Sequence, residues 1–128
     1  MEQKEILEEF EELQETMSAW GSQYLYNREY LGVMQVLLDK NERYTPGEQD
    51  FIIALYQRCG EETQERVRFM EKLDADIGLM VSYSITDALS VLNERKVEAQ
   101  ALFAKFENTY NECKPFVNRM PEEVLLNL

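Results

Sequence analysis

The chain has no histidine among its 128 residues, so it lacks the side chain that most often serves as a base, nucleophile or metal ligand. Serine and cysteine triads of the usual kind and His-carboxylate di-iron bundles all need that ring. The two cysteines, Cys59 and Cys113, are too few for an all-thiolate zinc site or an iron–sulfur cluster. The five glycines are solitary, so there is no glycine-rich phosphate loop. We therefore expect no cofactor and no enzymatic activity.

Carboxylates are the chemistry that remains. Two spaced motifs, E-E-x-x-E and E-x-x-D, are formed by Glu8, Glu9, Glu12, Glu71 and Asp74. On facing helices they could hold Mg²⁺ through oxygen ligands. The pattern is similar to that of the all-α nucleotide pyrophosphatases of the MazG type, but the two motifs lie further apart than that family places them. In a chain with 25 acidic residues a solvated glutamate face explains the spacing better, so we predict no metal site and keep a carboxylate- and Mg²⁺-dependent nucleotide hydrolase as a third function hypothesis.

The charge balance restricts the partners. The formal net charge is −12 and the sequence pI is about 4.4, so the mean field repels phosphate backbones and anionic lipids. No apolar run approaches the roughly 18 to 20 residues that a membrane span needs, and the acidic N-terminus is unlike a secretory signal. We expect a cytoplasmic protein that binds neither nucleic acid nor membrane directly. In a reducing compartment the cysteines suit small buried apolar positions, with an interhelical disulfide as the alternative.

The elements that position these residues are predicted to be helices. Apolar residues recur at steps of three and four, which predicts a first helix over about residues 2–40. The stripe consists of Ile6, Phe10, Leu13, Met17, Trp20, Tyr24, Asn27, Leu31, Met34 and Leu38. Gly21 and Gly32 lie inside it and each costs about 1 kcal/mol relative to alanine, so a bend there is the alternative. The rhythm continues past both glycines, which favours one helix.

A second helix is predicted over about residues 46–82. The segment TPGE supplies Thr45 as the N-cap, Pro46 at the first helical position and Glu48 to complete a capping box. The chain then forms either one rod or two rods hinged at Gly60. The predicted buried residues are Phe51, Ile52, Leu55, Tyr56, Cys59, Val67, Met70, Leu73, Ile77 and Met80.

A third helix is predicted over about residues 85–113, because Ser84 and Asp87 provide a capping signal and Pro115 favours a stop before it. Its seam is predicted to contain Leu89, Leu92, Lys96, Ala99, Phe103, Phe106, Tyr110 and Cys113. The Lys96 side chain is expected to extend its charge past the edge of this seam. A short helix over about residues 121–127 follows Pro121.

The resulting fold prediction is all-α. Three to four long amphipathic helices are expected to form an antiparallel bundle with coiled-coil-like packing, as one domain over residues 1–128. The stripes are wider than a strict zipper seam, which favours packing within the chain.

Partner-binding residues are predicted in two places. The first is an aromatic flank of the first helix, Trp20, Tyr24 and Tyr30, together with Asn27. Trp and Tyr dominate interface hot spots, although core packing of a long amphipathic helix is the favoured explanation for these rings. Asn27 either fixes the register of a coiled coil or lies at the rim. The second place is the C-terminal segment, through Leu125 and Leu128.

These features favour a non-catalytic interaction module, acting as an adaptor, assembly subunit or chaperone. The expected partner is a protein, through an amphipathic helix or a second copy of this chain. The alternative is an acidic inhibitor or nucleic-acid mimic, such as a phage-encoded antagonist, which would occupy a basic site with carboxylates.

Overall fold

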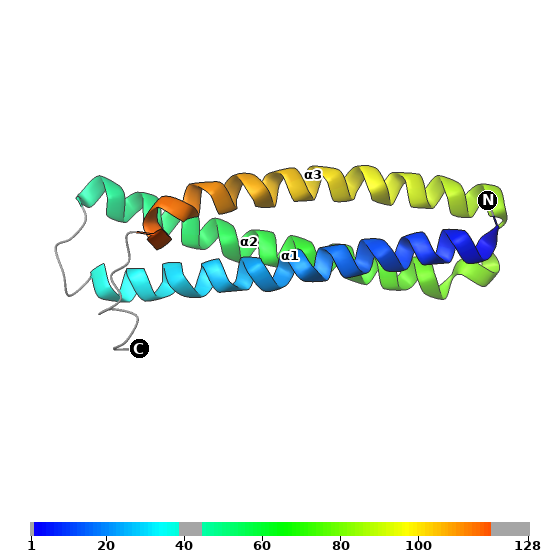
Figure 1. The fold of residues 1–128 in the computed structure, drawn as a ribbon, viewed down its shortest axis with the longest axis horizontal. Helices are drawn as coiled ribbons and strands as arrows, with labels where there is room; N and C mark the ends of the chain where they lie inside the picture. The colour runs from blue at the N-terminus through cyan, green and yellow to red at the C-terminus, as the bar shows by residue number, and fades with distance from the viewer. Residues whose placement is uncertain (1, 39–44, 119–128) are drawn as a thin grey trace.

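The computed structural model describes residues 2–38 and 45–118, without the side chains of residues 22–30, 37, 38 and 116–118. The helices are α1 (Gln3–Leu38), α2 (Pro46–Gly78) and α3 (Ile85–Asn118), with a short 3-10 helix, η1 (Met80–Ser82), between the last two. The prediction of an all-α bundle is confirmed. Figure 1 shows the three long helices side by side, with α2 antiparallel to both α1 and α3. The short helix predicted over 121–127 lies outside the described residues.

Side-chain caps set the starts of α2 and α3. The backbone N–H of Glu48 donates to Thr45 Oγ1 at 3.2 Å, and the N–H of Thr45 donates to Glu48 Oε1 at 3.3 Å. At the start of α3, the N–H of Asp87 donates to Ser84 Oγ at 3.1 Å. These bonds satisfy backbone donors that have no partner within the helix, and they confirm both predicted capping signals.

The helices are continuous through their interior glycines, so α2 is one rod. At Gly21 a Cβ atom would lie 2.5 Å from the guanidinium of Arg66, and at Gly32 it would lie 3.1 Å from the ring of Tyr56. The missing side chains therefore let α2 approach α1 closely at these two levels. At Gly60 a Cβ atom would meet nothing within 4 Å, so no close contact explains that glycine.

The end of α3 differs from the prediction. The helix includes Pro115 and ends at Asn118, so the expected stop before Pro115 is wrong. Proline lacks the N–H that would donate to a carbonyl one turn earlier. Because the helix ends within one turn of Pro115, the lost bond affects only its terminal turn.

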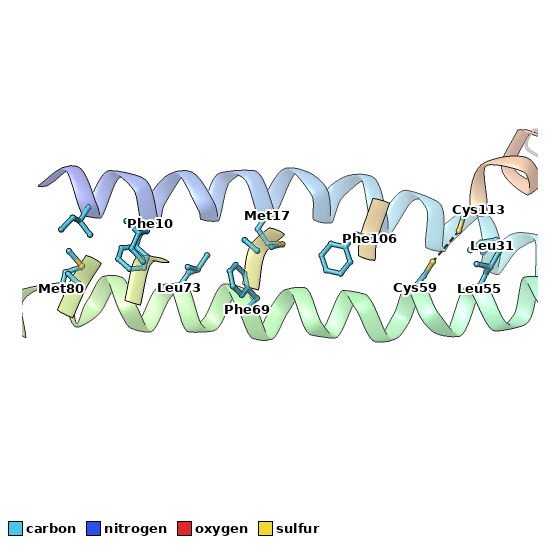
Figure 2. Close-up of a cluster of buried hydrophobic side chains, with 14 of the residues drawn as sticks. Phe10, Met17, Leu31, Leu55, Cys59, Phe69, Leu73, Met80, Phe106 and Cys113 are labelled. Carbon is cyan, nitrogen blue, oxygen red and sulfur yellow. Dashed lines mark hydrogen bonds between the residues drawn. The ribbon is translucent and has the colours of Figure 1, made fainter. Parts of the chain in front are cut away.

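The core side of α1 agrees with the predicted stripe. Ile6, Phe10, Met17, Leu31 and Met34 are buried at 0–2% exposure. Figure 2 shows Phe10, Met17 and Leu31 directed towards Leu73, Phe69 and Leu55 of α2, respectively. Apolar burial along the full length of the bundle is the main term that stabilises such a fold.

The core side of α2 lies one residue away from part of the predicted stripe. Arg66 is half-buried and fills the one gap, between Glu62 and Phe69, in a series of buried residues at steps of three and four. The buried residues are Ile52, Leu55, Cys59, Glu62, Phe69, Leu73, Asp76 and Met80. Phe51 and Val67, predicted to be buried, are 41% and 42% exposed. The prediction was wrong here because the inward stripe passes through three charged residues, whereas only apolar residues were accepted as core.

On α3 the predicted residues at seven-residue intervals are fully buried, and those between them are half-buried. The confirmed buried positions are Leu92, Ala99, Phe106 and Cys113. The predicted intermediates are half-buried beside the core, and they are Leu89, Lys96, Phe103 and Tyr110. Ala88 and Thr109 are fully buried instead. Lys96 extends to the rim as expected, where its Nζ donates to Glu9 Oε1 at 3.0 Å.

Candidate functional site

The predicted aromatic flank is described only in part. Trp20 is half-buried, and its ring centroid lies 5.9 Å from that of Phe103 on α3, with the planes tilted by 33°. The side chains of Tyr24, Asn27 and Tyr30 lie outside the described part, as do Leu125 and Leu128. Partner binding by these residues stays a prediction.

Two members of the carboxylate motifs contact side chains outside the motifs. Glu9 pairs with Lys96, and Asp74 accepts a hydrogen bond from the side-chain amide of Gln14. Glu8 and Glu12 are exposed to solvent. Within residues 2–38 and 45–118 no group of three Asp, Glu or Cys side chains is placed to hold a metal ion.

Glu62 is a carboxylate in the core of the bundle. It is 1% exposed, and its Oε1 accepts a hydrogen bond from Thr109 Oγ1 at 2.8 Å. Its Oε2 is buried, and no described residue gives it a hydrogen bond. Burial raises the pKa of Glu62 to about 7, although the Thr109 bond and the nearby Lys105 charge oppose the rise. This carboxyl therefore changes its charge near neutral pH.

Arg66 continues the polar stripe one helical turn further along α2. Its guanidinium lies where the Cβ of residue 21 would be, so it packs directly against the backbone of α1 at Gly21. Its Nε is buried without a hydrogen-bond partner among the residues that the structure describes. A buried N–H without a partner costs free energy, so this level of the core is less stable than an apolar one.

Asp76 is the third charged residue of the stripe and, unlike Glu62, it is paired with a cation. It is 4% exposed, and Arg95 Nε donates to its Oδ2 at 2.7 Å. Arg95 Nη1 also donates to Glu98 Oε1 at 3.0 Å. The hydrogen bond with Asp76 raises the pKa of Arg95, so the guanidinium stays charged over the whole ordinary pH range.

Further ion pairs follow the seam between α2 and α3. From one end of the seam to the other they are Arg58–Glu112, Glu65–Lys105, Lys72–Glu98 and Asp76–Arg95. On α2 the sign alternates between positive and negative along the seam. The first two steps are seven residues long on both helices, so sliding α3 by seven residues would bring Glu65 opposite Glu98 or Glu112. The alternation therefore favours one register.

Cys59 and Cys113 are fully buried and form no disulfide, as predicted for small core side chains. They come from α2 and α3 and point towards one another, as Figure 2 shows, and their sulfur atoms lie 3.9 Å apart. The hydrogen bond with Cys59 and burial raise the pKa of Cys113 well above its ordinary value. Cys113 is therefore a thiol at neutral pH, which makes it a poor nucleophile in the closed bundle.

A groove of about 400 Å³ lies over the seam between α2 and α3. Phe69, Ala101 and Leu102 provide its apolar lining, and its charged lining consists of Glu65, Arg68, Lys72 and Glu98. A second hollow on α3 shares Glu98 and contains Val97, which is 68% exposed. Together they form one continuous surface, which we call the seam groove.

Sequence reasoning missed the charged core residues and the seam groove. The signal for Glu62, Arg66 and Asp76 was present, because the three-four rhythm that starts at Ile52 reaches each of them without a break. The groove had no such signal, since its lining comes from two helices whose register the apolar pattern alone does not fix.

The described arrangement can pair charges and take up a proton at Glu62. Within its described residues, no helix is long and apolar enough to cross a membrane. The chain matches no family model, no curated protein and no solved structure.

Proposed function

We propose that this chain is a non-catalytic interaction module that binds an amphipathic helix of another protein in the seam groove. The observation that carries the proposal is the groove itself, an apolar floor bordered by charges on a bundle whose core is already complete. We expect it to act in the cytoplasm, where the glutathione pool favours the thiol form of Cys59 and Cys113.

The lining determines what kind of segment would fit. Phe69 and Leu102 offer apolar contact at the centre, and the exposed small residue Ala101 leaves room for a partner side chain. The rim carries Glu65 and Glu98 as well as Arg68 and Lys72, so it suits a helix with an apolar stripe flanked by both charge signs. Such a helix would extend the bundle as a fourth member.

Site-specific photocrosslinking tests the proposal in cells that naturally produce the protein. A photoreactive side chain at Ala101 should give a covalent adduct with one partner, whereas the same group at the exposed neighbour Gln100 should not. Adding Leu102→Glu should remove the adduct, because a charge in the floor opposes apolar docking. Equal labelling from both positions, or none from Ala101, would contradict the proposal. An adduct of two copies would show that self-association occupies the groove.

A second candidate is the acidic inhibitor or nucleic-acid mimic. It is favoured by an exposed stripe on α1 at steps of three and four, formed by Glu5, Glu8, Glu12 and Glu15. None of these four has an ion-pair partner among the described residues. Binding to a basic protein through this stripe should weaken steeply as salt rises, while helix binding in the seam groove should change little. Replacing all four by Gln separates the two, since only the salt-sensitive binding should be lost.

A further inference from the structure

We infer that Cys59 and Cys113 form a reversible disulfide that locks the C-terminal end of α3 onto α2. The two buried thiols already lie 3.9 Å apart, and the Arg58–Glu112 ion pair holds the same level of the seam from the residues just before them. The inference concerns the bundle's own covalent state and does not depend on the proposed partner.

The closed bundle protects these thiols. Both are fully buried, and the raised pKa of Cys113 leaves almost no thiolate to react. Cys113 lies close to the end of α3, with Pro115 in the terminal turn, while Cys59 lies within the body of α2. Helix ends open locally at low free energy, so Cys113 is the thiol that becomes accessible first.

A low-molecular-weight disulfide, such as glutathione disulfide, is the oxidant class that fits this order. The Cys113 thiolate attacks one sulfur of glutathione disulfide, forming a mixed disulfide and releasing one glutathione thiolate. When α3 closes again, the Cys59 thiolate attacks the Cys113 sulfur and releases the second glutathione. The two protein thiols lose two electrons and two protons, and glutathione disulfide takes up both to become two glutathione thiols.

The bond would change the molecule in a measurable way. It closes a chain segment that runs from α2 through the turn into α3, which restricts the unfolded state more than the folded one. The melting temperature should rise by about 10 °C or more for a loop of this length in a chain of this size.

The test uses the full chain incubated with glutathione disulfide near its melting midpoint and then cooled. Intact mass and counting of free thiols should show a monomer that has lost two hydrogens and both thiols, with the higher melting temperature reversed by dithiothreitol. A chain that keeps two free thiols, forms linked dimers, or melts lower when oxidised would overturn the inference.

Two matched variants identify the order of events. In Cys59→Ala the reaction should stop at glutathione bound to Cys113, without the rise in melting temperature. In Cys113→Ala, labelling of Cys59 should be several-fold slower, because α2 does not fray at that position. Equal labelling rates in the two folded variants would contradict entry through the end of α3. Because the main comparison is between oxidised and reduced wild-type protein, it stands even if a variant folds poorly.

Discussion

The core near the turn between α2 and α3 is built from aromatic and aliphatic side chains, whereas the core near the cysteines contains a carboxylate, a hydroxyl and two thiols. We call these the turn half, around Phe10 and Leu73, and the cysteine half, around Glu62 and Cys113. Figure 2 shows Phe10 and Leu73 of the turn half, with Cys113 of the cysteine half further along the same bundle. Each half includes a buried acidic residue of α2, and the halves differ in which partners that residue has.

In the turn half Asp76 is paired with Arg95, while in the cysteine half one oxygen of Glu62 has no hydrogen-bond partner among the described residues. Burial raises the pKa of Glu62 to about 7, whereas the bond with Asp76 keeps Arg95 charged. The same backbone architecture can therefore hold a level whose cation keeps its charge and a level whose carboxyl responds to pH.

The largest effect on stability is expected from removing a large side chain from the core of the turn half. Phe10→Ala removes a fully buried ring, and should lower the free energy of unfolding by about 3 to 5 kcal/mol. Urea unfolding followed by circular dichroism measures it. The exposed control Glu8→Ala should change stability by less than about 0.5 kcal/mol. A loss under about 1 kcal/mol for Phe10→Ala would mean that this half is not tightly packed.

The next effect concerns pH and the cysteine half. Because the pKa of Glu62 rises from 4.5 to about 7 on folding, the folded chain holds a proton that the unfolded chain releases. The stabilising contribution is fully present below pH 4.5 and is lost as the pH rises through 7, a change of about 3 kcal/mol.

Glu62→Gln should remove this loss, because the amide oxygen can still accept from Thr109 Oγ1 but does not titrate. The measurement is urea unfolding of both proteins at pH 4.5, 6 and about 8. Parallel stability curves for wild type and variant would show that Glu62 does not distinguish the two halves.

The smallest effect tests the ion pairs that cross both halves. Glu65→Lys places a second cation opposite Lys105, and the repulsion between the two should destabilise the fold by up to about 1 kcal/mol. Adding Lys105→Glu restores opposite charges, so the double variant should return most of that loss. If the stability loss of the double variant equals the sum of the two single-variant losses, the Glu65–Lys105 pair does not contribute to stability.

Most of the fold could be predicted from the sequence, since the apolar rhythm and the two capping signals depend on local chemistry. The continuity of α1 followed from a stripe that passes Gly21 and Gly32 unchanged. The end of α3 at Asn118 was not predictable in this way. A proline in the last turn of a helix removes one hydrogen bond near the end of that helix, so Pro115 does not by itself set the last helical residue.

The site was less predictable because it depends on charges in the core. Glu62 and Asp76 look like solvent-facing residues in a chain with 25 acidic ones, and only the register with α3 reveals Thr109 and Arg95 beside them. The seven-residue spacing of Arg58, Glu65 and Lys72 is visible in the sequence. That these residues form ion pairs became clear only when the structure placed Glu112, Lys105 and Glu98 of α3 opposite them.

That alternating series also bears on how the chain reaches its native state. A hairpin of α2 and α3 that collapses seven residues out of alignment would keep much of its apolar contact but would set Arg58 against Lys105. Such a misaligned species would be short-lived, so refolding should proceed as a single exponential without a populated trap.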